Sequence, residues 1–202
     1  MNKIRFTILS ILVLGFCFSA LASQELDSLE QKPNSRIVPY ISFMLESVGV
    51  DDRTIIQKGF SAGITINDKL NLGIYSNWHS DDLNFKKIGL PELRMKYMHG
   101  GVHTSYNHSI SRLLSLNVST RVGQGSVRLL QNSGELGIMK QRVVIMHPDV
   151  GLEIAATQRT KVQLNVGYRL MTDLKMQEIV KGDLTGFSYG VNIKFDLFKS
   201  NY

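Results

Sequence analysis

From residue 36 onward, apolar and polar residues alternate along the chain with a period of two. Successive side chains of a β-strand point to opposite faces, so this alternation predicts strands with one apolar face and one polar face. In the clearest run, Phe187 and Tyr189 alternate with Ser188 and Gly190, and the pattern continues to Leu197. Similar segments predict eight strands, at 37–48, 57–67, 69–79, 92–106, 113–123, 141–156, 161–171 and 184–198.

The connections between these segments alternate in length. Three are short, namely Asp68, 107–112 and 157–160. The other four are longer and polar, at about 49–56, 80–91, 124–140 and 172–183. Short turns on the periplasmic side and long loops outside are the layout of outer-membrane barrels. The sequence therefore predicts an all-β fold, an eight-stranded antiparallel up-and-down transmembrane β-barrel.

The polar face of the predicted strands holds charged, small and amide side chains. In a membrane barrel this face lines the interior, where opposite charges pair and glycines leave room for larger neighbours. Aromatic residues also lie near the strand ends on the apolar face, with Trp78 and Phe187 near the outer rim and Tyr106 and Phe195 near the inner one. We expect a lumen polar network made of Arg121, Asp149, Glu153, Lys161, Asn165, Arg169, Lys194 and Asp196.

Three local features suggest strand registers. The residues Asn67-Asp68-Lys69 predict a tight hairpin that pairs Ile66 with Leu70. The adjacent glycines at 100–101 predict a β-bulge, which would turn His99 and His103 to opposite faces. The short 157–160 connection predicts that residue numbers of paired positions sum to about 318. That register places Asp149 opposite Arg169 and Glu153 opposite Asn165.

The first 22 residues have the features of a secretory signal peptide. Lys3 and Arg5 precede the apolar run 6–18, and Ala20-Leu21-Ala22 is a small-x-small cleavage site. The alternative is an uncleaved anchor. We expect a signal peptide at 1–22, a flexible periplasmic leader at 23–36 and the barrel at 37–202.

Composition then narrows the function classes. The net charge of +6 falls to +4 without the two signal-peptide cations, and the remaining charges are scattered, which argues against a nucleic-acid partner. The single cysteine, Cys17, leaves with the signal peptide, so no disulfide is expected. After residue 22 no apolar stretch approaches 18 residues, the length that a transmembrane helix needs.

Five stretches of the chain carry a resemblance to known proteins. They are 59–78, the Gly100-Gly101 strand, His147-Pro148 with 150–154, Val166-Gly167-Tyr168-Arg169 and 184–198. With these stretches the whole mature chain resembles the small outer-membrane β-barrel proteins, and more narrowly uncharacterised members from Bacteroidota-type bacteria. The resemblance implies an aromatic residue near the chain end that the barrel-assembly machinery recognises. Phe198 and Tyr202 match this feature loosely, because 199–201 breaks the alternation.

Few residues suggest chemistry. His103 and Ser105 have the two-residue spacing that lipid A deacylases use on a strand, but the alternation places both in the lumen, where polar filling is their expected role. No catalytic residue, metal site or cofactor is expected. The five histidines have no supporting cysteine, and the acidic pairs 51–52 and 81–82 are expected to be solvated loop residues.

The expected function is therefore that of an integral outer-membrane protein without enzymatic activity. It would have a structural or surface-binding role and no open pore, because eight strands enclose only enough space for side chains. Its expected partners are outer-membrane lipid, the barrel-assembly machinery and an extracellular ligand bound through the long loops. The alternatives are a lipid-modifying enzyme of the lipid A deacylase kind, a soluble periplasmic lipocalin-like carrier and a narrow conductance pore.

Overall fold

The computed structural model describes residues 36–50, 53–79, 83–85, 93–131, 137–172 and 185–198. The chain divides into two compact units, Met1–Arg36 and Ile37–Tyr202, and every described strand belongs to the second. The predicted signal peptide and nearly all of the predicted leader lie outside the described residues.

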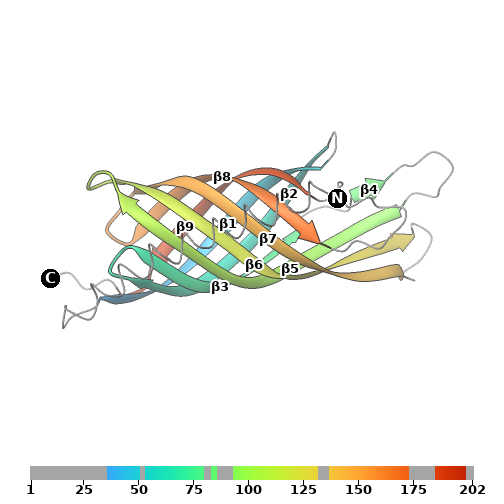
Figure 1. Cartoon of the computed structure of the whole chain (residues 1–202), viewed down its shortest axis with the longest axis horizontal. Coiled ribbons are helices and arrows are strands. Elements are labelled where there is room, and N and C mark those ends of the chain that lie inside the picture. Colours follow the sequence, from blue (N-terminus) through green and yellow to red (C-terminus); the bar gives the residue numbers. More distant parts are fainter. Residues whose placement is uncertain are drawn as a thin grey trace, which may run out of the picture. The chain divides into compact units, whose positions relative to one another are not determined.

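Nine strands are described, and eight of them form a closed ring (Figure 1). The order around the ring is β3-β2-β1-β9-β8-β7-β6-β5, and the pairing of β3 with β5 closes it. The short β4 adds to the free edge of β5. All pairs are antiparallel, which confirms the predicted eight-stranded antiparallel barrel. The strands are β1 Ile37–Val50, β2 Arg53–Ile66, β3 Leu70–His79, β4 Leu83–Phe85, β5 Leu93–Ser109, β6 Leu114–Gln131, β7 Gly137–Ala155, β8 Thr160–Thr172 and β9 Gly186–Asp196.

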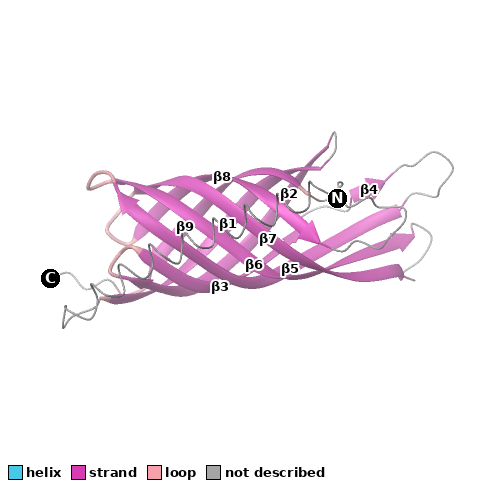
Figure 2. Ribbon diagram, in the orientation of Figure 1, coloured by secondary structure: helices cyan, strands magenta, loops and turns pink. Residues whose placement is uncertain are grey.

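The three short connections lie together at one end of the barrel, which we call the turn end (Figure 2). The opposite end, at which β3 finishes and β9 begins, is the loop end. In the first turn, Asn67 and Asp68 have left-handed φ values of 52° and 59°, which their short polar side chains tolerate. The Lys69 backbone N donates to the carbonyl oxygen of Ile66 at 3.0 Å. Ile66 pairs with Leu70, so the predicted hairpin register is confirmed.

Strands β6 and β7 are longer than the sequence predicts. The predicted loop 124–140 is wrong at both ends, because β6 continues to Gln131 and β7 begins at Gly137. Alternation continues through these ends with a different composition, since Val127 and Val143 point inward while Arg128 and Arg142 point outward. The loop predicted at 80–91 contains β4, which the sequence analysis did not expect.

The predicted bulge at Gly100-Gly101 is wrong. Ser76 pairs with Gly100 and Tyr75 with Gly101 in an unbroken register. With no extra residue, His99 and His103 lie four residues apart on one face, and both point into the lumen rather than to opposite faces.

The predicted register between β7 and β8 is wrong by two residues. Asp149 pairs with Gly167 rather than Arg169, and Glu153 pairs with Gln163. The cause lies in the turn, where the Thr157 hydroxyl accepts from the backbone N of Arg159 at 3.2 Å and of Thr160 at 2.9 Å. These bonds tighten the connection, so that β8 already begins at Thr160.

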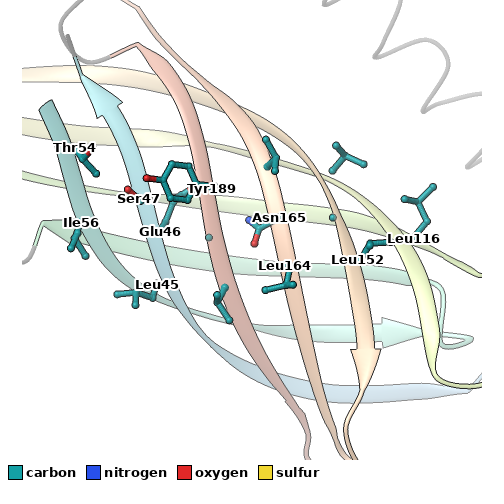
Figure 3. Close-up of a pocket in the computed structure, with 15 residues that line it drawn as sticks. Leu45, Glu46, Ser47, Thr54, Ile56, Leu116, Leu152, Leu164, Asn165 and Tyr189 are labelled. Carbon is teal, nitrogen blue, oxygen red and sulfur yellow. The ribbon is translucent and has the colours of Figure 1, made fainter. Parts of the chain in front are cut away.

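The outer surface of the barrel is apolar and its interior is mostly polar. Among the described residues, thirty large apolar or aromatic side chains are exposed, including Ile74, Val102 and Phe187. A pocket is lined mainly by such side chains, among them Leu45 and Leu164 (Figure 3). This is the reverse of the arrangement expected for a soluble lipocalin-like carrier, whose apolar face points inward.

The aromatic residues lie near the strand ends as predicted. Trp78 is near the loop end of β3, where its ring lies 6.2 Å from that of Phe60. Phe187 is the second residue of β9, and its ring lies edge to face with that of Tyr168, with the centroids 5.0 Å apart. Phe195 lies at the opposite end of β9 and is also exposed.

The interior changes character along the barrel axis. Near the loop end, inward side chains from six strands are apolar or aromatic and almost fully buried. They form an apolar plug, made of Val48, Ile55, Tyr97, Val127, Val143, Ile145 and Met171. Below the plug, toward the turn end, most inward side chains are polar or charged, with Val38 and Met44 as buried apolar exceptions. Within the described residues, no helix is long and apolar enough to cross a membrane.

Candidate functional site

The candidate site is the polar interior of the barrel. All eight residues of the predicted lumen polar network are buried, at 0–9% exposure. Most of them fall into two groups along the axis. The central cluster consists of Glu46, Arg121, His147 and Asp149, and the turn-end cluster consists of Glu153, Lys161, Lys194 and Asp196.

Arg121 organises the central cluster. Its guanidinium donates to both carboxylate oxygens of Glu46, through Nη2 to Oε1 at 2.9 Å and Nη1 to Oε2 at 3.2 Å. Nη2 also lies 3.4 Å from Asp149 Oδ2, while Asp149 Oδ1 accepts from the Ser119 hydroxyl at 2.6 Å. The planar fork of arginine matches a carboxylate with two parallel hydrogen bonds, so one cation fixes two anions from different strands.

A glycine makes the space for this cluster. A Cβ added at Gly167 would lie 2.8 Å from His147 Nε2 and 2.7 Å from Asp149 Cβ. Gly167 is also the residue that pairs with Asp149 across β7 and β8. The absence of a side chain on β8 therefore lets His147 and Asp149 extend across the lumen toward β1 and β6.

The turn-end cluster has a different centre, because here one carboxylate lies between two lysines. Glu153 lies 3.5 Å from Lys161 Nζ through Oε1 and 3.3 Å from Lys194 Nζ through Oε2. Asp196 lies 3.9 Å from Lys161 Nζ. Amides continue the network, since Asn107 donates to Glu153 at 3.2 Å and Lys194 donates to Asn71 at 3.2 Å.

The structure places Arg169 against Tyr97 of the apolar plug, although the sequence analysis paired it with Asp149. Its side chain is 0% exposed, and the guanidinium carbon lies 5.4 Å from the ring centroid of Tyr97. This cation–π contact joins the polar interior to the apolar plug. Asn165 is also buried, and it pairs with Gly151 between β8 and β7.

Among the described residues, the formal charges of the polar interior balance. The two arginines, Arg121 and Arg169, match Glu46 and Asp149, and the two lysines of the turn-end cluster match Glu153 and Asp196. Buried charges of this kind are tolerated only when they are paired and hydrogen-bonded. These paired side chains fill the lumen and hold its walls together. The net formal charge of the described lumen residues is zero, so it would not attract a permeating ion.

A serine, a histidine and a glutamate meet in this interior, but they do not form a catalytic triad. His147 Nε2 lies 2.6 Å from Ser188 Oγ and 3.3 Å from Glu46 Oε1. In a triad the acid and the nucleophile contact different ring nitrogens, whereas here both contact Nε2. All three residues are also 1–2% exposed, so a substrate would have no approach to the serine.

The other candidate pair, His103 and Ser105, lies on the inward face of β5, as the alternation predicts. His103 Nδ1 is 3.3 Å from the Tyr40 hydroxyl, and Ser105 Oγ accepts from Asn71 at 2.8 Å. The two residues bond to different neighbours inside the barrel. Over the described ranges, no group of three or more histidine, cysteine or acidic side chains could hold a metal ion. The acidic pairs 51–52 and 81–82 lie outside those ranges.

Sequence reasoning missed the partners that complete the network. Glu46, the strongest partner of Arg121, was not singled out, although it alternates with the outward Leu45 and Phe43 like other inward residues of β1. The amide chain was missed as well. In it, Gln163 donates to Asn117 at 2.8 Å and Asn117 donates to Asn107. The available signal was their position on the polar face, which marks a residue as inward but does not identify its partner.

Comparisons with known proteins agree on the fold. No protein-family model and no curated protein matches the chain. The crystal structure of Neisserial surface protein A matches with a TM-score of 0.58 at 9% identity, over 81% of this chain and 99% of that chain. The outer membrane protein OprG from Pseudomonas aeruginosa matches with a TM-score of 0.53 at 10% identity, over 79% and 97%. The resemblance to Bacteroidota-type barrels stays a prediction. This chain is thus similar in fold to outer-membrane β-barrel proteins.

Proposed function

We propose that this chain is an integral outer-membrane protein whose barrel has a sealed lumen and acts through its loop end, in a structural or surface-binding role. The single observation that carries the proposal is the distribution of side chains over the two faces of the ring. The outer face exposes a mainly apolar surface, and the inner face of the described strands holds balanced charges. Soluble monomers rarely expose apolar patches larger than a few hundred Å².

The height of the apolar face supports membrane insertion. On β7 the outward apolar residues extend from Val144 to Ile154, which is ten residue steps. At about 3.4 Å per step and a strand tilt near 40°, this corresponds to about 26 Å along the barrel axis. The apolar band of outer-membrane barrels is about 25 Å tall, so the two match.

The contents of the lumen support a barrel without conductance. The apolar plug fills the loop end, and the two charged clusters fill the middle and the turn end. Eight strands enclose only enough space for side chains, and here those side chains bond to one another across the interior. An ion would have to cross an apolar layer and then break paired charges.

The surface-binding role is supported by the unequal strand lengths. β5, β6 and β7 have 17, 18 and 19 residues, whereas β3 and β9 have 10 and 11. The longer strands extend past the others at the loop end (Figure 1). The loop-end parts of β5, β6 and β7 thus form a three-stranded extension, which could hold an extracellular ligand. At the other end, the exposed Phe198 follows β9 and would be read by the barrel-assembly machinery.

The test is to express the chain, fractionate the cell envelope and compare gel migration with and without boiling. We expect the protein in the outer-membrane fraction, with a faster band before boiling that shifts on heating, because a closed barrel resists detergent until it is heated. In planar bilayers the same folded protein is expected to give no discrete conductance steps. A soluble periplasmic protein without a heat-dependent shift would refute the proposal.

A further inference from the structure

Four cations lie together on the outward face of the three-stranded extension. Lys96 on β5 pairs with Arg128 on β6, and Arg128 pairs in turn with Lys140 on β7. Arg142 lies two residues further along β7 on the same face, and all four side chains are exposed. We call Lys96, Arg128, Lys140 and Arg142 the basic ridge.

The four cations of the basic ridge repel one another unless an anion lies beside them. Like charges directly opposite each other on neighbouring strands repel, because their Cβ atoms are only about 5 Å apart. Among the described residues, no ion pair joins the basic ridge to a carboxylate. The carboxylates of the described strands all point into the lumen, where they are Glu46, Asp149, Glu153 and Asp196. The remaining described carboxylate, Asp68, lies in a turn at the opposite end.

The position of the basic ridge indicates what would offset this repulsion. On β7, Arg142 is the next outward residue after Val144, where the apolar face ends. On β5, Lys96 is likewise the next outward residue after the exposed Met98. The four cations therefore stand at the level where lipid headgroups surround an inserted barrel. They face sideways, toward the lipid, rather than along the barrel axis.

We infer that the basic ridge binds the phosphate groups of anionic lipids in the leaflet around the loop end. This rests on the proposed function, because the barrel must be inserted for headgroups to lie at this level. Arginine and lysine are complementary to phosphate, Arg128 through a two-pronged hydrogen bond and the lysines as point charges. A lipid is favoured over a soluble anion because the acyl chains of the same molecule would lie on the adjoining apolar face.

The experiment uses the folded protein, extracted from cell envelopes and reconstituted in phosphatidylcholine vesicles. Spin-labelled phosphatidic acid or spin-labelled phosphatidylcholine is added in trace amount, and the fraction of each label held at the protein surface gives a relative association constant. The test variant combines Lys96→Gln, Arg128→Gln and Lys140→Gln. The matched control combines Lys69→Gln, Arg112→Gln and Arg159→Gln, which removes equal charge from exposed positions at the turn end.

We expect the wild-type protein to prefer phosphatidic acid, with a loss of up to about fivefold in relative association for each ridge cation removed. The control variant should retain the wild-type preference. Equal preference in the test variant and the wild type, or equal loss in the control, would overturn the inference. Full competition by dilute inorganic phosphate would also overturn it, since the binding would then not depend on a lipid. Failure of the wild-type protein to show a heat-shifted band would instead count against membrane insertion itself.

Discussion

The two charged clusters of the lumen pair their buried charges in different ways. In the central cluster one arginine holds two carboxylates, and Glu46 and Arg121 are only 2% and 1% exposed. In the turn-end cluster two lysines share one glutamate, and Lys161 is 9% exposed at the edge of the interior. An arginine fork fixes the positions of its partners, whereas lysines are mobile point charges with stems that reach toward water. We therefore expect the central cluster to set the geometry of the barrel and the turn-end cluster to tolerate change.

The largest expected effect follows from removing the central cation. Arg121→Met keeps the length of the side chain but removes the arginine cation that pairs with the buried Glu46 and Asp149, so the free energy of unfolding should fall by about 3–5 kcal/mol. The measurement is urea unfolding of the reconstituted barrel, followed by the loss of its heat-shifted band.

A double-mutant cycle separates charge from packing in this prediction. Adding Glu46→Gln to Arg121→Met should recover part of the lost stability, because a neutral amide needs no cation. If the two substitutions are simply additive, the ion pair does not hold the cluster together, and the distinction between the two clusters disappears.

An intermediate effect is expected from the glycine that makes space for the central cluster. Gly167→Ala places a methyl group 2.8 Å from His147 Nε2 and 2.8 Å from the backbone oxygen of Pro148, so something must shift. We expect a loss of about 1–3 kcal/mol in unfolding free energy, as for an overpacked core. Gly49→Ala is the matched control, since its Cβ would meet only the Phe187 carbonyl at 3.7 Å. Equal unfolding midpoints for the two variants would show that the central cluster has room to adjust.

The smallest effect is expected at the turn end. Lys161→Gln removes one of the two cations around Glu153 but leaves Lys194 at 3.3 Å, so we expect a loss of about 1 kcal/mol or less. The same urea titration measures it. A loss of unfolding free energy as large as that of Arg121→Met would mean that the two clusters are equally rigid. It would contradict the difference proposed between them.

Much of the fold follows from the sequence, because alternation is a local property. Each strand was placed by its own residues, and the inward face was assigned correctly for positions as far apart as Arg121 and Lys194. The errors arose where a local feature had two interpretations. Adjacent glycines at 100–101 fit a bulge, but here they occupy ordinary ladder positions with backbone of neighbouring strands close by.

The partners inside the lumen could not be predicted in the same way. Glu46 and Arg121 are 75 residues apart and lie on strands that are not neighbours in the ring, so their contact depends on the tilt and stagger of the whole barrel. A register error of two residues, such as the one caused by the Thr157 turn, moves every cross-strand pair on that face. Alternation is unchanged by such a shift, which is why the faces were correct while the assignment of Asp149 to Arg169 was not.

The extension of β7 beyond the ring also has a consequence for association between molecules. The last pair of β7 with β8 within the described residues is Val144 with Thr172, whereas the pairing of β7 with β6 continues to Gly137. Strand ends that project beyond a barrel are places where a strand of another molecule can add, and charged side chains along them discourage such growth. Lys140 and Arg142 are exposed on this part of β7, and the same residues of a second copy would repel them. The basic ridge would thus keep the extended strands of neighbouring molecules from pairing with one another.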